Sequence, residues 1–151
     1  MQVIRLHIVD DHQMMIDGLR ALLGDEPAFK IIAESNNGKV ALAKIETEQP
    51  DVLLTDISMP EMNGLDLTKA VKEKFPNVKI IALSMFGERN TISEMLQAGI
   101  NGYIVKNTGK QELVQAINKV ASGGMFFSDE VSAEMMKAIS NPAPKEEVIS
   151  L

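Results

Sequence analysis

The sequence predicts an α/β protein with an open, doubly wound parallel sheet of five strands and helices on both faces. Three observations lead to this fold class: five short apolar runs recur along the 151 residues, helical patterns lie between them, and Pro or Gly residues follow several helical patterns. Strands that alternate with helices are typical of parallel sheets, because a parallel connection has to cross one face of the sheet.

The expected strands are rich in Ile, Leu and Val and mostly do not alternate with polar residues. Such runs are typical of strands that are buried on both faces. The second run is flanked by Lys30 and Glu34, which favours a position at the edge of the sheet. The five runs span residues 3–9, 29–33, 52–55, 78–83 and 103–105.

The helices are predicted from apolar residues that recur on one face with the helical period. Pro76, Gly99 and Gly123 follow the third, fourth and fifth helices, where such residues commonly end a helix. A further helix is expected after Ser128 or Asp129, either of which could cap it. The clearest helical stripe consists of Leu113, Ala116, Ile117 and Val120.

The Gly and Pro residues that end helices divide the chain into three expected segments. Residues 1–124 form the main domain, 125–140 an additional C-terminal helix and 141–151 a linker, since Pro142 and Pro144 break the helical pattern.

Composition excludes several classes of function. There is no Cys, so disulfides, zinc–thiolate sites and thiol nucleophiles are excluded. The net charge of −6 and the aromatic content of 4% argue against a nucleic-acid-binding surface on this chain. No apolar run approaches the roughly 20 residues of a membrane span, so we expect a cytoplasmic protein without a membrane partner.

Polar residues follow four of the five expected strands. Asp10 and Asp11 follow the first, Asp56 the third, Ser84 the fourth and Lys106 the fifth. Ligands of doubly wound sheets bind outside the carboxyl ends of the strands, so these side chains are expected to converge.

The expected cluster favours phosphoryl transfer. Two carboxylates about 4 Å apart repel by about 4 kcal/mol at an effective dielectric constant near 20, so a divalent cation such as Mg²⁺ (or Mn²⁺) is needed. The Lys106 ammonium and the Ser84 hydroxyl suit phosphoryl oxygens, and the Asp56 carboxylate can act as a nucleophile.

Each of these residues also has a structural interpretation when it is taken alone. Asp10 and Asp11 could cap the first helix, and Asp56 could be an ordinary turn carboxylate. Lys106 could be a solvated surface amine, and Ser84 a satisfied hydroxyl. Their coincidence at four strand ends favours a common site.

The two histidines have plainer expectations. His7 is expected to be a paired residue inside the sheet. His12 is expected in a loop or first helical turn, with contact to a phosphodonor as an alternative.

The chain resembles the response-regulator receiver domain of bacterial two-component systems over about residues 3–122. A receiver has a flavodoxin-like (CheY-like) fold with the strand order 2-1-3-4-5. The motifs that carry the resemblance are Val9-Asp10-Asp11-His12, Leu54-Thr55-Asp56-Ile57-Ser58-Met59-Pro60-Glu61-Met62-Asn63-Gly64, Leu83-Ser84 and Gly102-Tyr103-Ile104-Val105-Lys106.

The resemblance implies a role for each motif residue. Asp56 would be the phosphoacceptor, and Asp11, Asp56 and the backbone carbonyl of Ser58 would hold Mg²⁺, with Asp10 assisting. A sensor histidine kinase would donate the phosphoryl group. Such a domain is not an enzyme beyond its own phosphotransfer and autodephosphorylation.

The same resemblance implies a switch and an output. Ser84 and Lys106 would contact the phosphoryl group, Ser84 and Tyr103 would switch, and phosphorylation would produce a homodimer. Tyr103 could instead be a strand residue whose hydroxyl reaches the surface. Many receivers have a small residue where this chain has Met85, so Met85 is expected to modulate access to the site.

The region after the fifth strand resembles the NarL/FixJ subfamily, whose receivers precede a LuxR-type helix-turn-helix domain. Residues 123–139 resemble its extra helix, and residues 146–151 resemble the run before the DNA-binding domain. DNA binding and transcription are therefore expected only through an effector domain that is absent from this chain.

Two alternatives remain. One is a stand-alone receiver that acts by protein–protein interaction. The other is a haloacid-dehalogenase-type phosphatase, although those enzymes have a second Asp two residues after the nucleophile, where this chain has Ser58.

Overall fold

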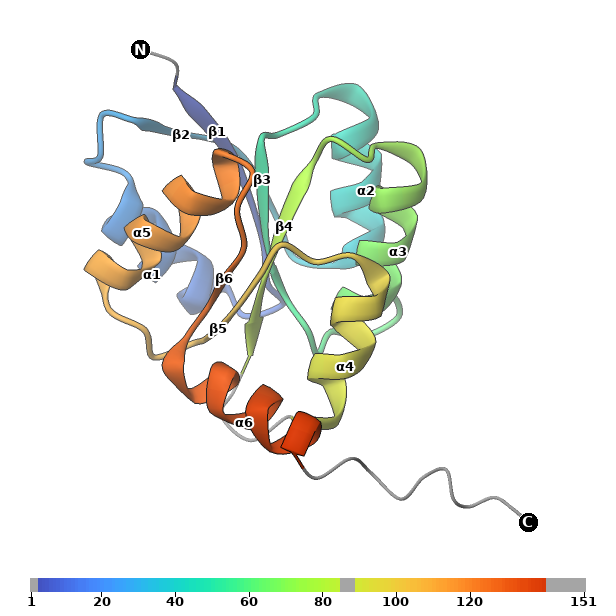
Figure 1. Cartoon of the computed structure of the whole chain (residues 1–151). Helices are drawn as coiled ribbons and strands as arrows, with labels where there is room; N and C mark the ends of the chain where they lie inside the picture. Colours follow the sequence, from blue (N-terminus) through green and yellow to red (C-terminus); the bar gives the residue numbers. More distant parts are fainter. Residues whose placement is uncertain (1–2, 85–88, 141–151) are drawn as a thin grey trace.

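A computed structural model describes residues 3–84 and 89–140, in which strands and helices alternate throughout (Figure 1). The strands are β1 (Ile4–Val9), β2 (Phe29–Ser35), β3 (Val52–Asp56), β4 (Lys79–Ser84), β5 (Gly102–Val105) and β6 (Phe126–Phe127). The helices are α1 (Gln13–Leu23), α2 (Gly38–Thr47), α3 (Gly64–Lys74), α4 (Arg89–Ala98), α5 (Lys110–Ala121) and α6 (Asp129–Ser140). Met85 and the predicted linker 141–151 lie outside the described residues.

The strands form one sheet in the order β2-β1-β3-β4-β5-β6, and every neighbouring pair is parallel. The predicted doubly wound sheet and its order 2-1-3-4-5 are therefore confirmed, with one strand added beyond β5. Because β1 and β3 are both central, their carboxyl ends lie beside each other at one edge of the sheet.

Helices cover both faces of the sheet, as the apolar strands require. In Figure 1, α1 and α5 lie on one face, while α2, α3 and α4 lie on the other. Two separate hydrophobic cores result, and consecutive strand residues divide between them: Leu53 joins the α2–α3–α4 core, whereas Leu54 joins the α1–α5 core. None of the helices in the described part of the chain is long and apolar enough to span a bilayer.

A sixth strand, which the sequence did not predict, precedes the C-terminal helix that was expected after Ser128 or Asp129. Phe126 and Phe127 pair with Gly102 and Tyr103 of β5, and they pack into opposite cores. A strand places successive side chains on opposite faces, so it lets each ring cover one core at this edge. α6 begins at Asp129, but the buried Ser128 hydroxyl makes no hydrogen bond to any described residue and therefore does not cap the helix.

His7 lies inside the sheet as a paired residue, which confirms its expected position. Its side chain is fully buried in β1, and its Nε2 lies 2.8 Å from the Ser35 hydroxyl oxygen of β2. Burial, and to a lesser extent the Lys44 ammonium, lowers the pKa of His7 to about 4. The ring is therefore neutral at physiological pH.

Gly64 allows α3 to begin directly against the end of β3. Its backbone N–H donates to the Ile57 carbonyl oxygen at 2.8 Å. A Cβ atom at this position would overlap the Asp56 carbonyl oxygen and lie 2.8 Å from the Ile57 Cα atom. The connection after Asp56 can take this path only with a glycine.

We expect Gly64→Ala to lower the free energy of unfolding by about 1–3 kcal/mol, because the backbone around Asp56 must shift to admit the methyl group. Gly18→Ala in α1 is the matched control. Apart from the adjacent residues and the backbone of α1 itself, no described atom lies within 4 Å of the added Cβ there, so this variant is expected to gain about 0.5–1 kcal/mol from the higher helix propensity of alanine. Urea unfolding of both variants measures the difference, and equal stabilities would contradict the close approach.

Candidate functional site

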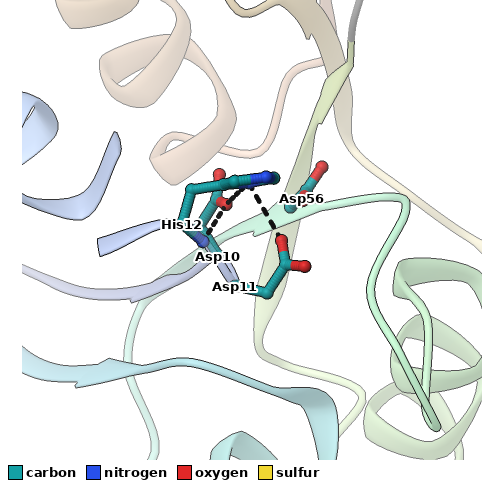
Figure 2. Close-up of side chains that lie close together, drawn as sticks. All are labelled: Asp10, Asp11, His12 and Asp56. Atoms are coloured by element: carbon teal, nitrogen blue, oxygen red, sulfur yellow. Dashed lines mark hydrogen bonds and ion pairs between the residues drawn. The ribbon is translucent and has the colours of Figure 1, made fainter. Parts of the chain in front are cut away.

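The carboxyl ends of four strands bring the predicted polar residues to one edge of the sheet. Asp56 and Ser84 are the last residues of β3 and β4, and Asp10 and Lys106 immediately follow β1 and β5. Figure 2 shows Asp10, Asp11 and His12 on the connection after β1, facing Asp56 from β3. The predicted convergence of acids and amine is confirmed.

Lys106 forms ion pairs with two of the carboxylates. Its Nζ lies 3.0 Å from Asp56 Oδ1 and 3.3 Å from Asp10 Oδ2. The Lys106 side chain is only 13% exposed, and those of Asp56 and Asp10 are 4% and 0% exposed. The interpretation of Lys106 as a solvated surface amine is therefore wrong.

The buried ion pairs shift the protonation of both partners. Burial is the main reason that the pKa of Asp56 rises to about 6; the Lys106 ammonium opposes this rise, and the Asp10 and Asp11 carboxylates add to it. Burial alone would lower the pKa of Lys106, but Asp56 and Asp10 outweigh it and raise that pKa above its ordinary value. Near neutral pH the site therefore holds an ammonium beside a largely ionised Asp56.

Asp10, Asp11 and Asp56, which we call the acidic cluster, have the features of a divalent-cation site. Their carboxylate oxygens and a His12 ring nitrogen lie within 4.8 Å of one another. Three carboxylates face one Lys106 ammonium, and the buried Asp56 Oδ2 has no hydrogen-bond partner within the described ranges. Hard oxygen donors with excess negative charge suit Mg²⁺.

Asp10 and Asp11 do not cap the first helix, so that structural alternative is wrong. The residue at the N-cap of α1 is His12, and no side chain caps there. Asp10 Oδ1 instead accepts a hydrogen bond from the His12 backbone N–H at 2.9 Å. This bond bends the chain directly after β1 and turns Asp11 toward Asp56.

The His12 imidazole ring lies beside the acidic cluster, a position that the sequence alone does not predict. It was expected in a loop or first turn, and it is the N-cap residue. Its Nδ1 lies 3.0 Å from both Asp10 Oδ1 and Asp11 Oδ1. The hydrogen bond to Asp10 and the charge of Asp11 raise the pKa of His12.

The predicted switch residues lie on the neighbouring strands β4 and β5. Ser84 is 2% exposed, and its backbone carbonyl accepts a hydrogen bond from the Lys106 N–H at 2.8 Å. Tyr103 is 1% exposed, so the alternative of a hydroxyl reaching the surface is wrong. Ser58 lies exposed on the connection after β3, whereas Met85 is outside the described residues.

The turn at residues 36–38 also contacts the site. The Asn36 side-chain amide donates to the Asp10 carbonyl oxygen at 3.3 Å. The Asn37 side chain caps α2 by accepting from the Val40 N–H at 2.8 Å. Asn before a helical pattern is a capping signal that could have identified Asn37 from the sequence.

Known proteins resemble this chain in sequence and in fold. Transcriptional regulatory protein DegU from Brevibacillus brevis is 33% identical over 134 residues, which are 89% of this chain and 57% of DegU. The isolated receiver domain of RcsB from Salmonella enterica serovar Typhimurium, solved with the phosphomimetic BeF3-, has a TM-score of 0.80 and 26% identity, and the match covers 88% of this chain and 99% of the RcsB domain.

A two-component response regulator of the LuxR family from Aurantimonas sp. SI85-9A1 shares the fold, with a TM-score of 0.87, 24% identity and coverage of 93% of this chain and 100% of the other. The chain spans 57% and 61% of the length of two curated relatives, DegU and LnrK.

Residues 6–118 match the family described as the response regulator receiver domain. The match spans β1 to α5, so it includes every strand end that contributes to the site. The alternative of a haloacid-dehalogenase-type phosphatase is therefore wrong. Receivers bind Mg²⁺ at an acidic pocket and are generally not catalytic enzymes. The chain therefore belongs to the response regulator receiver domain family.

Proposed function

We propose that this receiver accepts a phosphoryl group on Asp56 from a sensor histidine kinase. The observation that carries the proposal is the position of the Lys106 ammonium, 3.0 Å from Asp56 Oδ1 and 3.3 Å from Asp10 Oδ2. A buried cation at this distance neutralises the negative charge that a phosphoryl group brings to a carboxylate.

In the proposed transfer, an Asp56 carboxylate oxygen attacks the phosphorus of the kinase phosphohistidine. The new P–O bond forms as the P–N bond breaks, and the kinase imidazole leaves with the electron pair. The pKa of Asp56 near 6 keeps most of the carboxylate ionised at pH 7. The chain's own contribution is to hold Asp56 and Lys106 in place while the charge moves.

The acidic cluster would hold Mg²⁺ for this reaction. We assign Asp11, Asp56 and the backbone carbonyl of Ser58 as its ligands. Asp10 would assist, because its carboxylate already accepts from the His12 N–H and pairs with Lys106. When bound, the ion supplies positive charge to the phosphoryl oxygens.

Phosphorylation would then switch the domain through Ser84 and Tyr103. A phosphoryl group adds about −1.5 to −2 charge units at neutral pH. Moving a two-state domain from 1:99 to 99:1 requires about 5.5 kcal/mol of differential stabilisation. New contacts with Ser84 and Lys106 would alter the carboxyl ends of β4 and β5, and Tyr103 on β5 would move in response; the connection after β4, where we also expect a movement, lies outside the described residues.

We further propose a homodimer as the phosphorylated state and transcription as its output. Response regulators pair with histidine kinases and dimerise, and DegU is named a transcriptional regulatory protein. DNA binding in the whole protein would then reside in a separate LuxR-type domain. A stand-alone receiver would share the phosphorylation but not this output.

Replacing Asp56 tests the phosphoacceptor. With acetyl phosphate and Mg²⁺, the wild type is expected to gain one acid-labile phosphoryl group, and Asp56→Asn none, because the amide cannot form the acyl phosphate. Intact-mass spectrometry measures the addition. Asp66→Asn, at an exposed acid in the first turn of α3, is the matched control and should label as the wild type does. Labelling of Asp56→Asn would refute the assignment.

Removing the ammonium tests the electrostatics of Asp56. The Lys106 charge lowers the pKa of Asp56, so Lys106→Ala should raise that pKa above about 6. The midpoint of the phosphorylation rate against pH is expected to move upward by about 1 or more, with labelling recovered at pH 8. Lys110→Ala removes an exposed lysine that pairs with Asp25 and Glu26, and it should leave the profile unchanged. An identical profile for Lys106→Ala would count against the ion pair.

The same variant tests the switch when it is phosphorylated at pH 8. The wild type is expected to double its mass on treatment with phosphodonor, whereas phosphorylated Lys106→Ala is expected to stay monomeric, because the phosphoryl group has lost its partner on β5. Light scattering coupled to gel filtration measures both masses. Phosphate-dependent dimerisation that is unchanged in Lys106→Ala would exclude Lys106 from the coupling.

A further inference from the structure

We infer that His12 determines the metal preference of this site: its imidazole supplies a fourth donor that favours divalent transition ions, such as Zn²⁺, over Mg²⁺. The inference rests on the proposed function, because it concerns the same acidic cluster. It goes further in assigning to His12 a role that the carboxylates alone do not provide.

The first support is the short distance between the His12 ring nitrogen and one carboxylate oxygen of each neighbouring aspartate. His12 Nδ1 lies 3.0 Å from Asp10 Oδ1 and 3.0 Å from Asp11 Oδ1. In an octahedral site with bonds of about 2.1 Å, adjacent ligand atoms lie about 3.0 Å apart. A ring proton on Nδ1 can hold this place by bonding to the carboxylates, and a cation that replaces the proton has the ring nitrogen and oxygens of both aspartates nearby, since these donor atoms lie within 4.8 Å of one another.

The second support is that the backbone fixes the ring at the cluster. The His12 N–H donates to Asp10 Oδ1 at 2.9 Å, and the His12 carbonyl oxygen accepts the first bonds of α1 from Met15 and Ile16. The His12 side chain does not cap the helix. The ring is 67% exposed, and within the described part of the chain its polar partners are the carboxylates of Asp10 and Asp11.

Asp56 is the remaining member of the cluster, and it is buried. The Asp56 side chain is 4% exposed, and its Oδ2 has no hydrogen-bond partner in the part of the chain that the structure describes. Such an atom lowers stability unless a cation or donor approaches it. Asp56 and His12 come from different strands' ends, so a shared ion would join β1 to β3 (Figure 2).

The preference between Zn²⁺ and Mg²⁺ depends on whether the ligand atom is an imidazole nitrogen or a carboxylate oxygen. Mg²⁺ takes oxygen ligands and keeps several waters, so it gains little from an imidazole and has to displace the ring from Asp10 and Asp11. Transition ions accept imidazole nitrogen readily, and Zn²⁺ binds it at about 2.0–2.1 Å. His12 should therefore strengthen Zn²⁺ binding and leave Mg²⁺ binding equal or weaker.

The test compares the binding of each metal alone to the full chain by isothermal titration calorimetry at pH 7.5. His12→Ala removes the ring, and His12→Gln offers an amide oxygen in place of the nitrogen. Both variants are expected to weaken Zn²⁺ binding at least about tenfold and to change Mg²⁺ binding less than about threefold. Met14→Ala, at an 86% exposed residue in the first turn of α1, is the matched control.

A nitrogen-15 spectrum of the imidazoles gives a readout that a merely structural role would not move. The chain has two histidines, so the buried His7 serves as an internal reference. Zn²⁺ is expected to shift the His12 Nδ1 resonance strongly, while Mg²⁺ is not expected to give a metal-bound nitrogen signal.

Zn²⁺ affinity that stays within twofold in His12→Ala, or Zn²⁺ binding that leaves His12 Nδ1 unshifted, would overturn the inference. Either result leaves the proposed function standing, because that function fails on different measurements: labelling of Asp56→Asn, or no Mg²⁺-dependent labelling of the wild type.

Discussion

The interaction on which the rest of the structure depends is the burial of carboxylates against one ammonium at the carboxyl edge of the sheet. Asp10 and Asp56 are almost fully buried, and Lys106 is the cation that lies between them. Burial disfavours charged carboxylates, as the raised pKa of Asp56 reflects, and the single ammonium leaves excess negative charge. A site in this state gains stability from any additional cation, and it also responds strongly to added anionic charge.

The fold can keep these carboxylates close together because many independent backbone contacts fix the surrounding strands and turns. β1 and β3 are paired on both sides within the sheet and are packed between two apolar cores, so their ends cannot move apart to relieve the repulsion. Gly64 closes α3 against the end of β3, and the bond from the His12 N–H to Asp10 closes the turn after β1. The stability of the cores thus offsets the cost of the polar edge.

The sequence predicts most of this because buried parallel strands and strand-end polar residues are both local signals. The strand order and the convergence of Asp56 with Lys106 follow from those signals together with the resemblance. β6 was not predicted, since two residues are too few to show a period, and Phe126 with Phe127 is defined only by pairing with β5. The contacts of His12 with Asp10 and Asp11 are local in the sequence, but they depend on the backbone turn after β1, which the residue pattern does not specify.

The added strand β6 also constrains how a movement of Tyr103 could be transmitted to the rest of the domain. Tyr103 shares a core with Phe127 of β6 and with Val131 and Met135 of α6, and the Ser128 N–H donates to the Tyr103 carbonyl oxygen at 3.1 Å. Packed cores respond to displacement by repacking rather than by small continuous deformation. A movement of Tyr103 would therefore have to be accommodated by its neighbours in this core, and β6 and α6 are among them.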